Sequence, residues 1–427
     1  MSGHSVASQH SLPGADDITR VQLCNGIVVL ARSNFNSPSV TVSGYLQAGG
    51  LSDPIDKLGL ADFTASALMR GSQRRSFQQI YDALESAGAS LGIDSGTHTS
   101  GFGGKSLAED LDLLLSLLAE VLIEPTFPAE HVERLRAQLL TGLAIRAQDT
   151  GDMASLTFDQ MVYANHPYRH PEDGYPETIA AVSREDLVDF HKQYYGPAGM
   201  VVVVVGAVET RRAVERVEAY LGNWVNPDQP LTPALPPVIP LEETVVRKTT
   251  IAGKSQADIV LGVAGPGRRS PDYFPAALGN SILGQFGLGG RIGDSVREKA
   301  GLAYYAHSSL AGGLGPGPWS VSAGVDPRNV DQAIGLIRQE ITRFTTERVL
   351  ADELSDSQAN FIGRLPLSLE SNGGVAGALL NLERFELGLD YYRRYADLVS
   401  VVSVDDVLAT AQRYLDNERL GVAIAGP

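Results

Sequence analysis

The stretch SREDLVDFHKQYYGPAGMVVVVVGAV, residues Ser183 to Val208, joins a helical pattern to an apolar run. Ser183 is a typical helix N-cap because acidic residues follow it in the first turn. The run Met200 to Val205 is too short to cross a bilayer and predicts a buried strand. The same order recurs in SVDDVLATAQRYLDNERLGVAIAGP, Ser403 to Pro427, with Ser403 as the expected N-cap. The chain therefore repeats one helix–strand unit.

A second pair of segments extends the repeat toward the start of each half. VTVSGYLQAGGLSDPIDKLGLADFTASAL, Val40 to Leu68, and ADIVLGVAGPGRRSPDYFPAALGNSIL, Ala257 to Leu283, both predict a strand, a polar turn and a helix of small residues. Between the halves, NPDQPLTPALPPVIP, Asn226 to Pro240, is rich in proline and predicts a linker. We therefore expect an N-terminal domain over 18–225, a linker over 226–242 and a C-terminal domain over 243–427.

The fold class follows from the mixture of elements in each half. Long amphipathic helices are expected over Leu107 to Leu122 and Ala129 to Ala147, where apolar residues recur at three- and four-residue steps. Asn25-Gly26 between ITRVQL and IVVLAR predicts a hairpin, so some strand pairing is antiparallel. The sequence thus predicts an α+β protein with two homologous domains, each with helices packed on a mixed, largely antiparallel sheet.

Composition excludes several classes of function. A length of 427 residues favours two or more domains, and the formal net charge of −16 disfavours nucleic acid and anionic membrane surfaces as partners. Residues 1–17 contain no Lys or Arg and no apolar core, which argues against a targeting signal. Cys24 is the only cysteine, so an intrachain disulfide and a thiolate metal cage are excluded. We expect a cytoplasmic protein that does not span a membrane.

Three motifs carry a family resemblance. They are KLGLADFTASALMRGS (Lys57 to Ser72), HPYRHP (His166 to Pro171) and VREKAGLAYYAHSSL (Val296 to Leu310). Together with the repeat, they resemble the inverted-motif zinc peptidases, the family of pitrilysin, insulinase and mitochondrial processing peptidase. The resemblance covers about residues 18 to 427. It implies two homologous domains that form a half-ring.

The first motif departs from the family at the metal site. Members carry HxxEH on a helix, where two His side chains on one face bind zinc and the Glu activates water. Here the corresponding positions hold Asp62, Ala65 and Ser66, and the family's third ligand, a Glu, falls on Gly142. One carboxylate cannot supply three ligands, and Ala65 cannot accept a proton. The resemblance therefore implies that this chain has no catalytic residue of its own and binds no metal, with zinc expected in a partner subunit.

The third motif retains Arg297 and Tyr304, seven residues apart. They match an arginine and a tyrosine that contact the substrate backbone in the family, and both are donors suited to a peptide carbonyl. A helix is expected from near Gly290 to Arg297, stopped by Gly301, with Tyr304 starting a strand. Tyr305 is the adjacent candidate, because strand alternation turns only one of the two tyrosines toward a cleft. Taken singly, Arg297 could be a solvated helix-end cation and Tyr304 a half-buried strand aromatic.

The segment LGQFGLGGRIG, Leu283 to Gly293, is rich in glycine. It lacks the GK[ST] of a phosphate-binding loop. The family's non-catalytic processing subunit has a glycine-rich segment implicated in substrate handling, so the resemblance suggests a substrate-contact loop. Its candidate residues are Gly284, Gly287, Gly289 and Gly290. A flexible connection is the alternative.

These observations lead to one functional expectation and its alternatives. We expect a non-catalytic subunit of a heterodimeric zinc metallopeptidase, which binds peptide substrates and presents Arg297 and Tyr304 to the zinc site of an HxxEH-bearing homologous partner. A structural or peptide-binding homologue without a peptidase role is the first alternative. An independent enzyme of another chemistry is the second, and no constellation of residues supports it.

Overall fold

The computed structural model describes residues 12–427, which form two compact units. Unit 1 contains the chain up to Leu143, Pro171–Ala234 and Leu365–Arg393, and unit 2 contains Ala144–His170, Leu235–Arg364 and Arg394–Pro427. Residues 1–11, most of the segment assessed for a targeting signal, lie outside the described residues. Each unit has its own sheet and hydrophobic core. The predicted α+β class is confirmed, whereas the half-ring stays a prediction.

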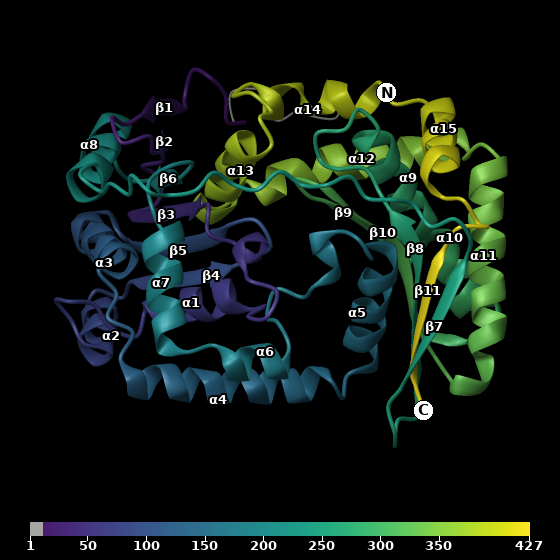
Figure 1. The fold of residues 1–427 in the computed structure, drawn as a ribbon. Coiled ribbons are helices and arrows are strands. Elements are labelled where there is room, and N and C mark those ends of the chain that lie inside the picture. Colours follow the sequence, from purple (N-terminus) through teal and green to yellow (C-terminus); the bar gives the residue numbers. More distant parts are fainter. Residues whose placement is uncertain (1–11) are drawn as a thin grey trace. The chain divides into compact units, whose positions relative to one another are not determined.

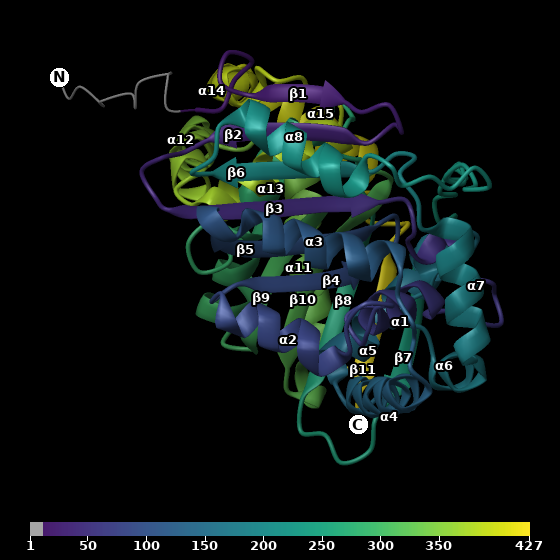
Figure 2. The same cartoon turned by 90° about the vertical axis from the view of Figure 1, so that its left-hand side faces the viewer.

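Unit 1 is built on a six-stranded sheet in the order β1-β2-β6-β3-β5-β4, which can be followed from top to bottom in Figure 2. Its strands are β1 (Thr19–Gln22), β2 (Val28–Ser33), β3 (Ser39–Leu46), β4 (Ser90–Ser95), β5 (Ser100–Leu107) and β6 (Val201–Gly206). Its helices are α1 (Leu60–Leu68), α2 (Phe77–Ser86), α3 (Leu111–Ile123), α4 (Ala129–Arg146, which continues into unit 2), α6 (Pro176–Ala181), α7 (Arg184–Tyr194), α8 (Thr210–Leu221) and α13 (Asn372–Arg384).

Unit 2 is built on a five-stranded sheet in the order β7-β11-β8-β10-β9. Its strands are β7 (Val245–Thr250), β8 (Ala257–Ala264), β9 (Ala303–Gly312), β10 (Pro316–Val325) and β11 (Gly421–Gly426). Its helices are α5 (Thr150–Val162), α9 (Tyr273–Gly284), α10 (Gly290–Ile292), α11 (Val330–Thr346), α12 (Ala351–Ser368), α14 (Tyr391–Ser400) and α15 (Val404–Tyr414), of which α12 and α14 extend into unit 1. Figure 1 shows α5 on one side of this sheet and α11 on the other.

The two sheets confirm the internal repeat. In unit 1, β6 runs parallel to β2 and antiparallel to β3; in unit 2, β11 runs parallel to β7 and antiparallel to β8. Each repeat thus ends in a central strand, and both of these strands are buried along their whole length. The preceding helices begin at Ser183 and Ser403, each in a capping box with an Asp three residues later. The predicted strands and caps are confirmed.

A strand that is buried on both faces needs a layer of side chains on each side. In unit 1, helices such as α1, α3, α7 and α8 cover one face of the sheet. Helix α13, from the C-terminal half of the chain, contacts β3 and β6 on the other face, where Arg384 lies 4.7 Å from the ring centroid of Tyr45. Helix α5, from the N-terminal half, contacts β8 and β11 in unit 2. The two halves therefore exchange one helix each.

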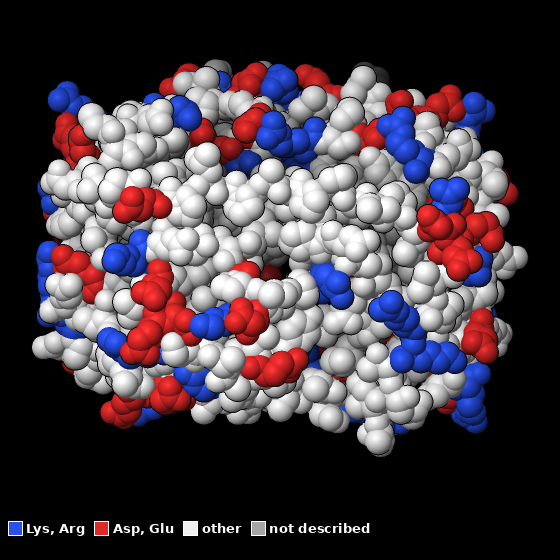
Figure 3. Space-filling view, in the orientation of Figure 1, with Lys and Arg blue, Asp and Glu red and all other residues white. Residues whose placement is uncertain are grey.

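The proline-rich segment has neither helix nor strand between Trp224 and the start of β7. Its first part belongs to unit 1, where Gln229 accepts a hydrogen bond from Ala198 N (3.0 Å) and donates one to Ala198 O (3.1 Å). Among the described residues, no helix combines the length and the apolar character that a membrane span requires. On the face in Figure 3, acidic and basic side chains are interspersed over a largely uncharged surface.

The exchange predicts that a core mutation in each half destabilises the sheet built mainly by the other half. Leu379 in α13 and Phe158 in α5 are almost fully buried, and truncating such a side chain costs about 2–5 kcal/mol. We expect Leu379→Ala to increase amide hydrogen exchange in β3 and β6, and Phe158→Ala to increase it in β8 and β11. The exchange would be contradicted if Leu379→Ala increased hydrogen exchange only in unit 2, or if Phe158→Ala increased it only in unit 1.

Candidate functional site

The helix that resembles the zinc-binding helix is α1, and its start is fixed by a partly buried acid. Gly59 precedes it in the left-handed region (φ 91°), which favours glycine. A carboxylate oxygen of Asp53 accepts a hydrogen bond from Gly59 N and the other from Ala61 N, both at 2.8 Å. These contacts satisfy backbone donors that a helix N-terminus leaves unpaired. The local sequence thus builds the family's helix without the family's metal ligands.

The four altered positions do not offer a zinc site. Asp62 and Ser66 are partly exposed and lie four residues apart on one face of α1, whereas Ala65, at the position of the catalytic base, is completely buried. Gly142 lies on the exposed surface of α4. Within residues 12–427, no group of three or more His, Cys, Asp or Glu side chains is arranged to hold a metal. A carboxylate and a hydroxyl do not replace three zinc ligands, so the residues at these positions do not fit the family's metal.

The surroundings of Asp62 are acidic. Burial raises the pKa of its carboxyl to about 6, and the nearby carboxylates of Asp173, Glu172 and Asp94 add to the rise. Burial likewise raises the pKa of Asp53 to about 7, although hydrogen bonds from the α1 backbone oppose the change. Sequence reasoning missed this cluster, because its members come from α1, β4 and the loop before α6. Spacing along the chain gives no signal that these segments meet.

Helix α1 also contains a hydroxyl group without a hydrogen-bond partner. Thr64 is completely buried in α1, and its Oγ1 has no hydrogen-bond partner among the described residues. Leaving a buried polar group unpaired costs about 1–3 kcal/mol. This helix therefore carries an unpaired hydroxyl and a carboxylate that burial keeps hard to ionise.

The predicted Arg297–Tyr304 segment has the expected local structure in unit 2. Arg297 lies in a π-helical segment, Gly293–Lys299, that follows α10; Gly301 has a φ of 65°, and β9 begins at Ala303. The Arg297 side chain is 43% exposed and pairs with Glu298 at 3.4 Å. Tyr304 is 84% exposed. Both donors are therefore available to a ligand, although the π-helical turn was not predicted.

The two tyrosines have different environments. Tyr304 lies where the register between β9 and β10 shifts, between the pairs Ala303–Val325 and Tyr305–Gly324, so the alternation expected for a regular strand is interrupted there. Tyr305 donates its hydroxyl to Asp258 Oδ1 at 2.6 Å. Burial and this carboxylate raise the pKa of Tyr305. Tyr305 is thus bound within the unit, and Tyr304 is the tyrosine left free to contact a ligand.

The glycine-rich segment packs closely against neighbouring backbone. A Cβ atom on Gly284, Gly289 or Gly290 would lie 2.3 to 2.5 Å from a backbone atom of β9 or α9. Gly289 and Gly290 also have positive φ values. Gly287 differs, because a Cβ there would meet no atom within 4 Å. Close packing therefore explains three of the four candidate glycines, and only Gly287 is open to a ligand.

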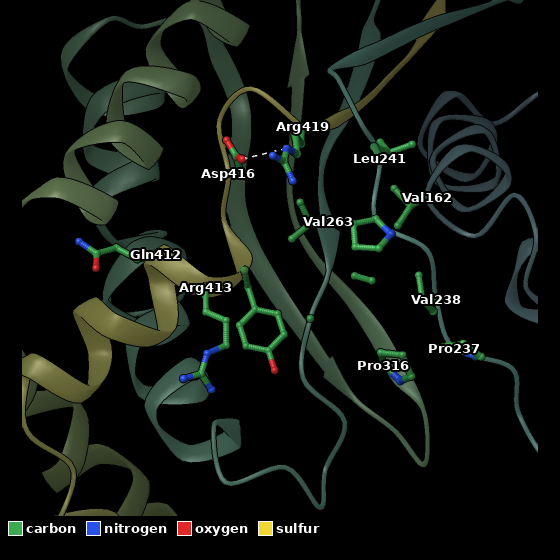
Figure 4. A pocket seen from close by; sticks show the side chains of 14 residues that line it. Val162, Pro237, Val238, Leu241, Val263, Pro316, Gln412, Arg413, Asp416 and Arg419 are labelled. Atoms are coloured by element: carbon green, nitrogen blue, oxygen red, sulfur yellow. Dashed lines mark ion pairs between the residues drawn. The ribbon is translucent and has the colours of Figure 1, made fainter.

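A cavity of about 630 Å³ lies in unit 2 beside the end of the proline-rich segment (Figure 4). Its wall is largely apolar and includes Val162, Leu241 and Val263. The arginines at its margin are already paired, Arg419 with Asp416 at 3.2 Å and Arg413 with Asp272 at 2.6 Å. The carboxylate of Asp416 is thus already paired, and the hydroxyl of Tyr414, which also lines the cavity, donates to Asp272. The cavity can shelter an apolar group but brings together no catalytic set.

The raised pKa of Asp62 predicts a pH-dependent gain in stability from Asp62→Asn. Since the folded pKa of about 6 exceeds the ordinary value, ionisation opposes folding at high pH and the penalty vanishes as the pH falls below about 4. Allowing for solvent screening, we expect a gain of about 1–2 kcal/mol at pH 8 that shrinks toward pH 4. Thermal unfolding across this range measures it. The exposed Asp56→Asn is the control, and equal gains from both variants would refute the assignment.

The glycine contacts predict unequal effects of alanine at two neighbouring positions. Gly290→Ala combines a positive φ with a Cβ 2.5 Å from Ile282 O, whereas Gly287→Ala has a positive φ alone. The positive φ costs each variant about 1–2 kcal/mol, and the clash should add a further loss to Gly290→Ala. Urea denaturation midpoints compare the two variants. Equal midpoints would show that the segment moves to relieve the clash at Gly290→Ala, as expected of a flexible connection.

Comparisons with known proteins agree with this geometry. An uncharacterised zinc protease of Mycobacterium leprae is 25% identical over 413 residues, which cover 96% of this chain and 92% of the relative. The beta subunit of mitochondrial-processing peptidase from Saccharomyces cerevisiae is 23% identical over 373 residues, 83% of this chain and 79% of that protein. The crystal structure of a peptidase M16 inactive domain from Pseudomonas fluorescens matches with a TM-score of 0.89, 24% identity and coverage of 96% and 98%.

Family models describe most of the chain. The model of insulinase, peptidase family M16, matches residues 28–164, which include α1 and the altered metal positions. The model of the peptidase M16 inactive domain matches residues 181–361, which include Arg297 and Tyr304. The repeat, the two sheets and these matches point to one conclusion. The chain belongs to the insulinase family of peptidases, family M16.

Proposed function

We propose that this chain is the non-catalytic subunit of a heterodimeric zinc peptidase, whose HxxEH-bearing homologous subunit supplies the metal and the base. The observation that carries the proposal is an asymmetry between the two halves. The metal positions hold Asp62, Ala65, Ser66 and Gly142, while Arg297 and Tyr304 keep the family spacing and remain exposed. The yeast relative is by its name one subunit of a peptidase, which supports a division of labour between chains.

The proposed role of Arg297 and Tyr304 follows from their chemistry. A guanidinium and a phenol are donors that can hold a peptide carbonyl and stabilise negative charge as it develops on the oxygen. The pairing of Arg297 with Glu298 is half exposed and therefore weak enough for Arg297 to exchange it for a substrate. Peptides are the proposed substrates, and the pair would act in the cytoplasm.

We expect the purified chain alone to retain no zinc and to cleave no peptide. Its complex with an HxxEH-bearing homologue should retain zinc and cleave peptides. In the complex, Arg297→Ala and Tyr304→Phe should each lower kcat/KM about 10²-fold or more, as expected for loss of a donor to a developing oxyanion. Metal analysis and hydrolysis of a fluorogenic peptide measure the two properties.

Arg328→Ala, which removes another exposed arginine of unit 2, is the control and should leave hydrolysis unchanged. Peptide hydrolysis by the lone chain that survives chelators would refute the proposal. So would full activity of the Arg297→Ala and Tyr304→Phe complexes, since the two donors would then have no part in the reaction.

The alternative is a structural or peptide-binding homologue without a peptidase role. One observation favours it, because a chain in the structure of complex III from Candida albicans shares the fold, with a TM-score of 0.75 and 15% identity. In that case the chain should form stable complexes or homodimers in which Arg297→Ala and Tyr304→Phe have no effect on any hydrolysis. Co-purification with metal analysis separates the two functions.

A further inference from the structure

The repeat allows equivalent positions in the two sheets to be matched through strand register. Thr41 of β3 lies opposite Val205, and Asp258 of β8 lies opposite Ala425; both partners directly precede the last glycine of the central strand. Thr41 therefore corresponds to Asp258. On the neighbouring strands β5 and β10, Lys105 corresponds to Gly324 in the same way. On the edge strands β4 and β9, Ser90 corresponds to Tyr305. One site in each unit can thus be compared residue by residue.

In unit 2 this site is filled by the protein itself. Asp258 is 3% exposed, and its carboxylate accepts hydrogen bonds from Tyr305 Oη (2.6 Å), Gln256 Nε2 (3.0 Å) and the hydroxyl of Thr150. Thr150 is the first residue of α5, so the carboxylate lies at a helix N-terminus, where negative charge is favoured. A Cβ on Gly324 would lie 2.6 Å from the Tyr305 ring, which leaves no free space.

In unit 1 the equivalent site is open. Threonine replaces the carboxylate and serine replaces the tyrosine, and a cavity of about 520 Å³ lies there. Its lining includes Thr41, Ser90, Lys105 and the first residues of α13, which begins after Ser371. A Cβ on Gly103, which also lines the cavity, would meet no atom within 4 Å.

Several polar side chains of the lining, such as Asn34 and Asn372, are hydrogen-bonded to each other, but two donors are not paired. Thr41 is 8% exposed as a residue, and its hydroxyl, which is open to the cavity, has no hydrogen-bond partner within residues 12–427. Lys105 has no ion-pair partner in the same part of the chain, and it brings a positive charge to a position that holds glycine in unit 2. Glu370 is the only carboxylate in the lining and is exposed. The hydroxyl of a largely buried threonine, an exposed lysine and a helix N-terminus therefore converge where unit 2 places a carboxylate.

We propose that this cavity binds a ligand through a carboxylate, which takes the place that Asp258 occupies in unit 2. Its volume suits a small organic acid or the C-terminal end of a short peptide. Lys105 neutralises the charge, and the hydroxyl of Thr41 and the backbone N–H groups at the start of α13 donate to the oxygens. All of these residues lie in unit 1. The proposal is thus independent of the role assigned to Arg297 and Tyr304.

The test is isothermal titration calorimetry of the full chain with three probes. They are succinate, the tripeptide Ser-Gly-Ala with a free C-terminus and the same tripeptide as its C-terminal amide. Saturable binding of succinate supports the proposal with a free acid as the source of the carboxylate. Binding of the free tripeptide but not the amide supports it with a peptide terminus as the source. Equal binding of peptide and amide, or no binding of any probe at millimolar concentration, overturns it.

Variants locate the binding. Lys105→Met should weaken binding about tenfold or more, because it removes the charge that pairs with the carboxylate. Thr41→Asp places the protein's own carboxylate in the site, as in unit 2, and should abolish binding. Thr41→Ser keeps a hydroxyl and should bind as the natural chain does. Unfolding temperature checks that each variant is folded, and unchanged affinity in folded Lys105→Met overturns the proposal even if Thr41→Asp fails to fold.

Discussion

The fold depends on the burial of both faces of a central strand. β6 consists of five valines and a glycine, and β11 is apolar along its length, so neither strand has a face suited to water. Each sheet consequently needs two layers of helices. The helices of the same half cover one face, and a single helix from the other half, α13 or α5, covers the second. The remaining architecture follows from this requirement, including the division of each unit into separate stretches of sequence.

Most of the local structure can be predicted, because local signals determine it. Ser183 and Ser403 are recognisable as caps since capping depends on a few neighbouring residues. The strand starting near Tyr304 and the stop at Gly301 are equally local. The exchange of helices cannot be predicted, because the apolar pattern of α5 is the same whichever sheet it covers. Periodicity reveals the buried face of a helix and not the identity of the surface that buries it.

The candidate site likewise has features that can be predicted from the sequence and features that cannot. The loss of zinc ligands is visible in the sequence, since ligand chemistry depends on residue type. The acidic surroundings of Asp62 are not, because β4 and the loop before α6 meet α1 only in the folded unit. The network around Asp258 escapes prediction for the same reason, although Tyr305 itself is a candidate from its motif. Side chains that act together come from distant segments, and a single sequence contains no record of their proximity.

The exchanged helices also bear on how such a chain could arise. A protein with only one copy of the repeat would have a sheet with one uncovered face and a helix that covers the sheet of another copy. Two identical copies could satisfy each other by domain swapping, which gives a symmetric dimer. Joining the copies through a proline-rich connection converts the swap into a permanent feature of one chain. Once joined, the copies no longer have to be identical, and one can fill with tyrosine and aspartate a space that the other leaves open.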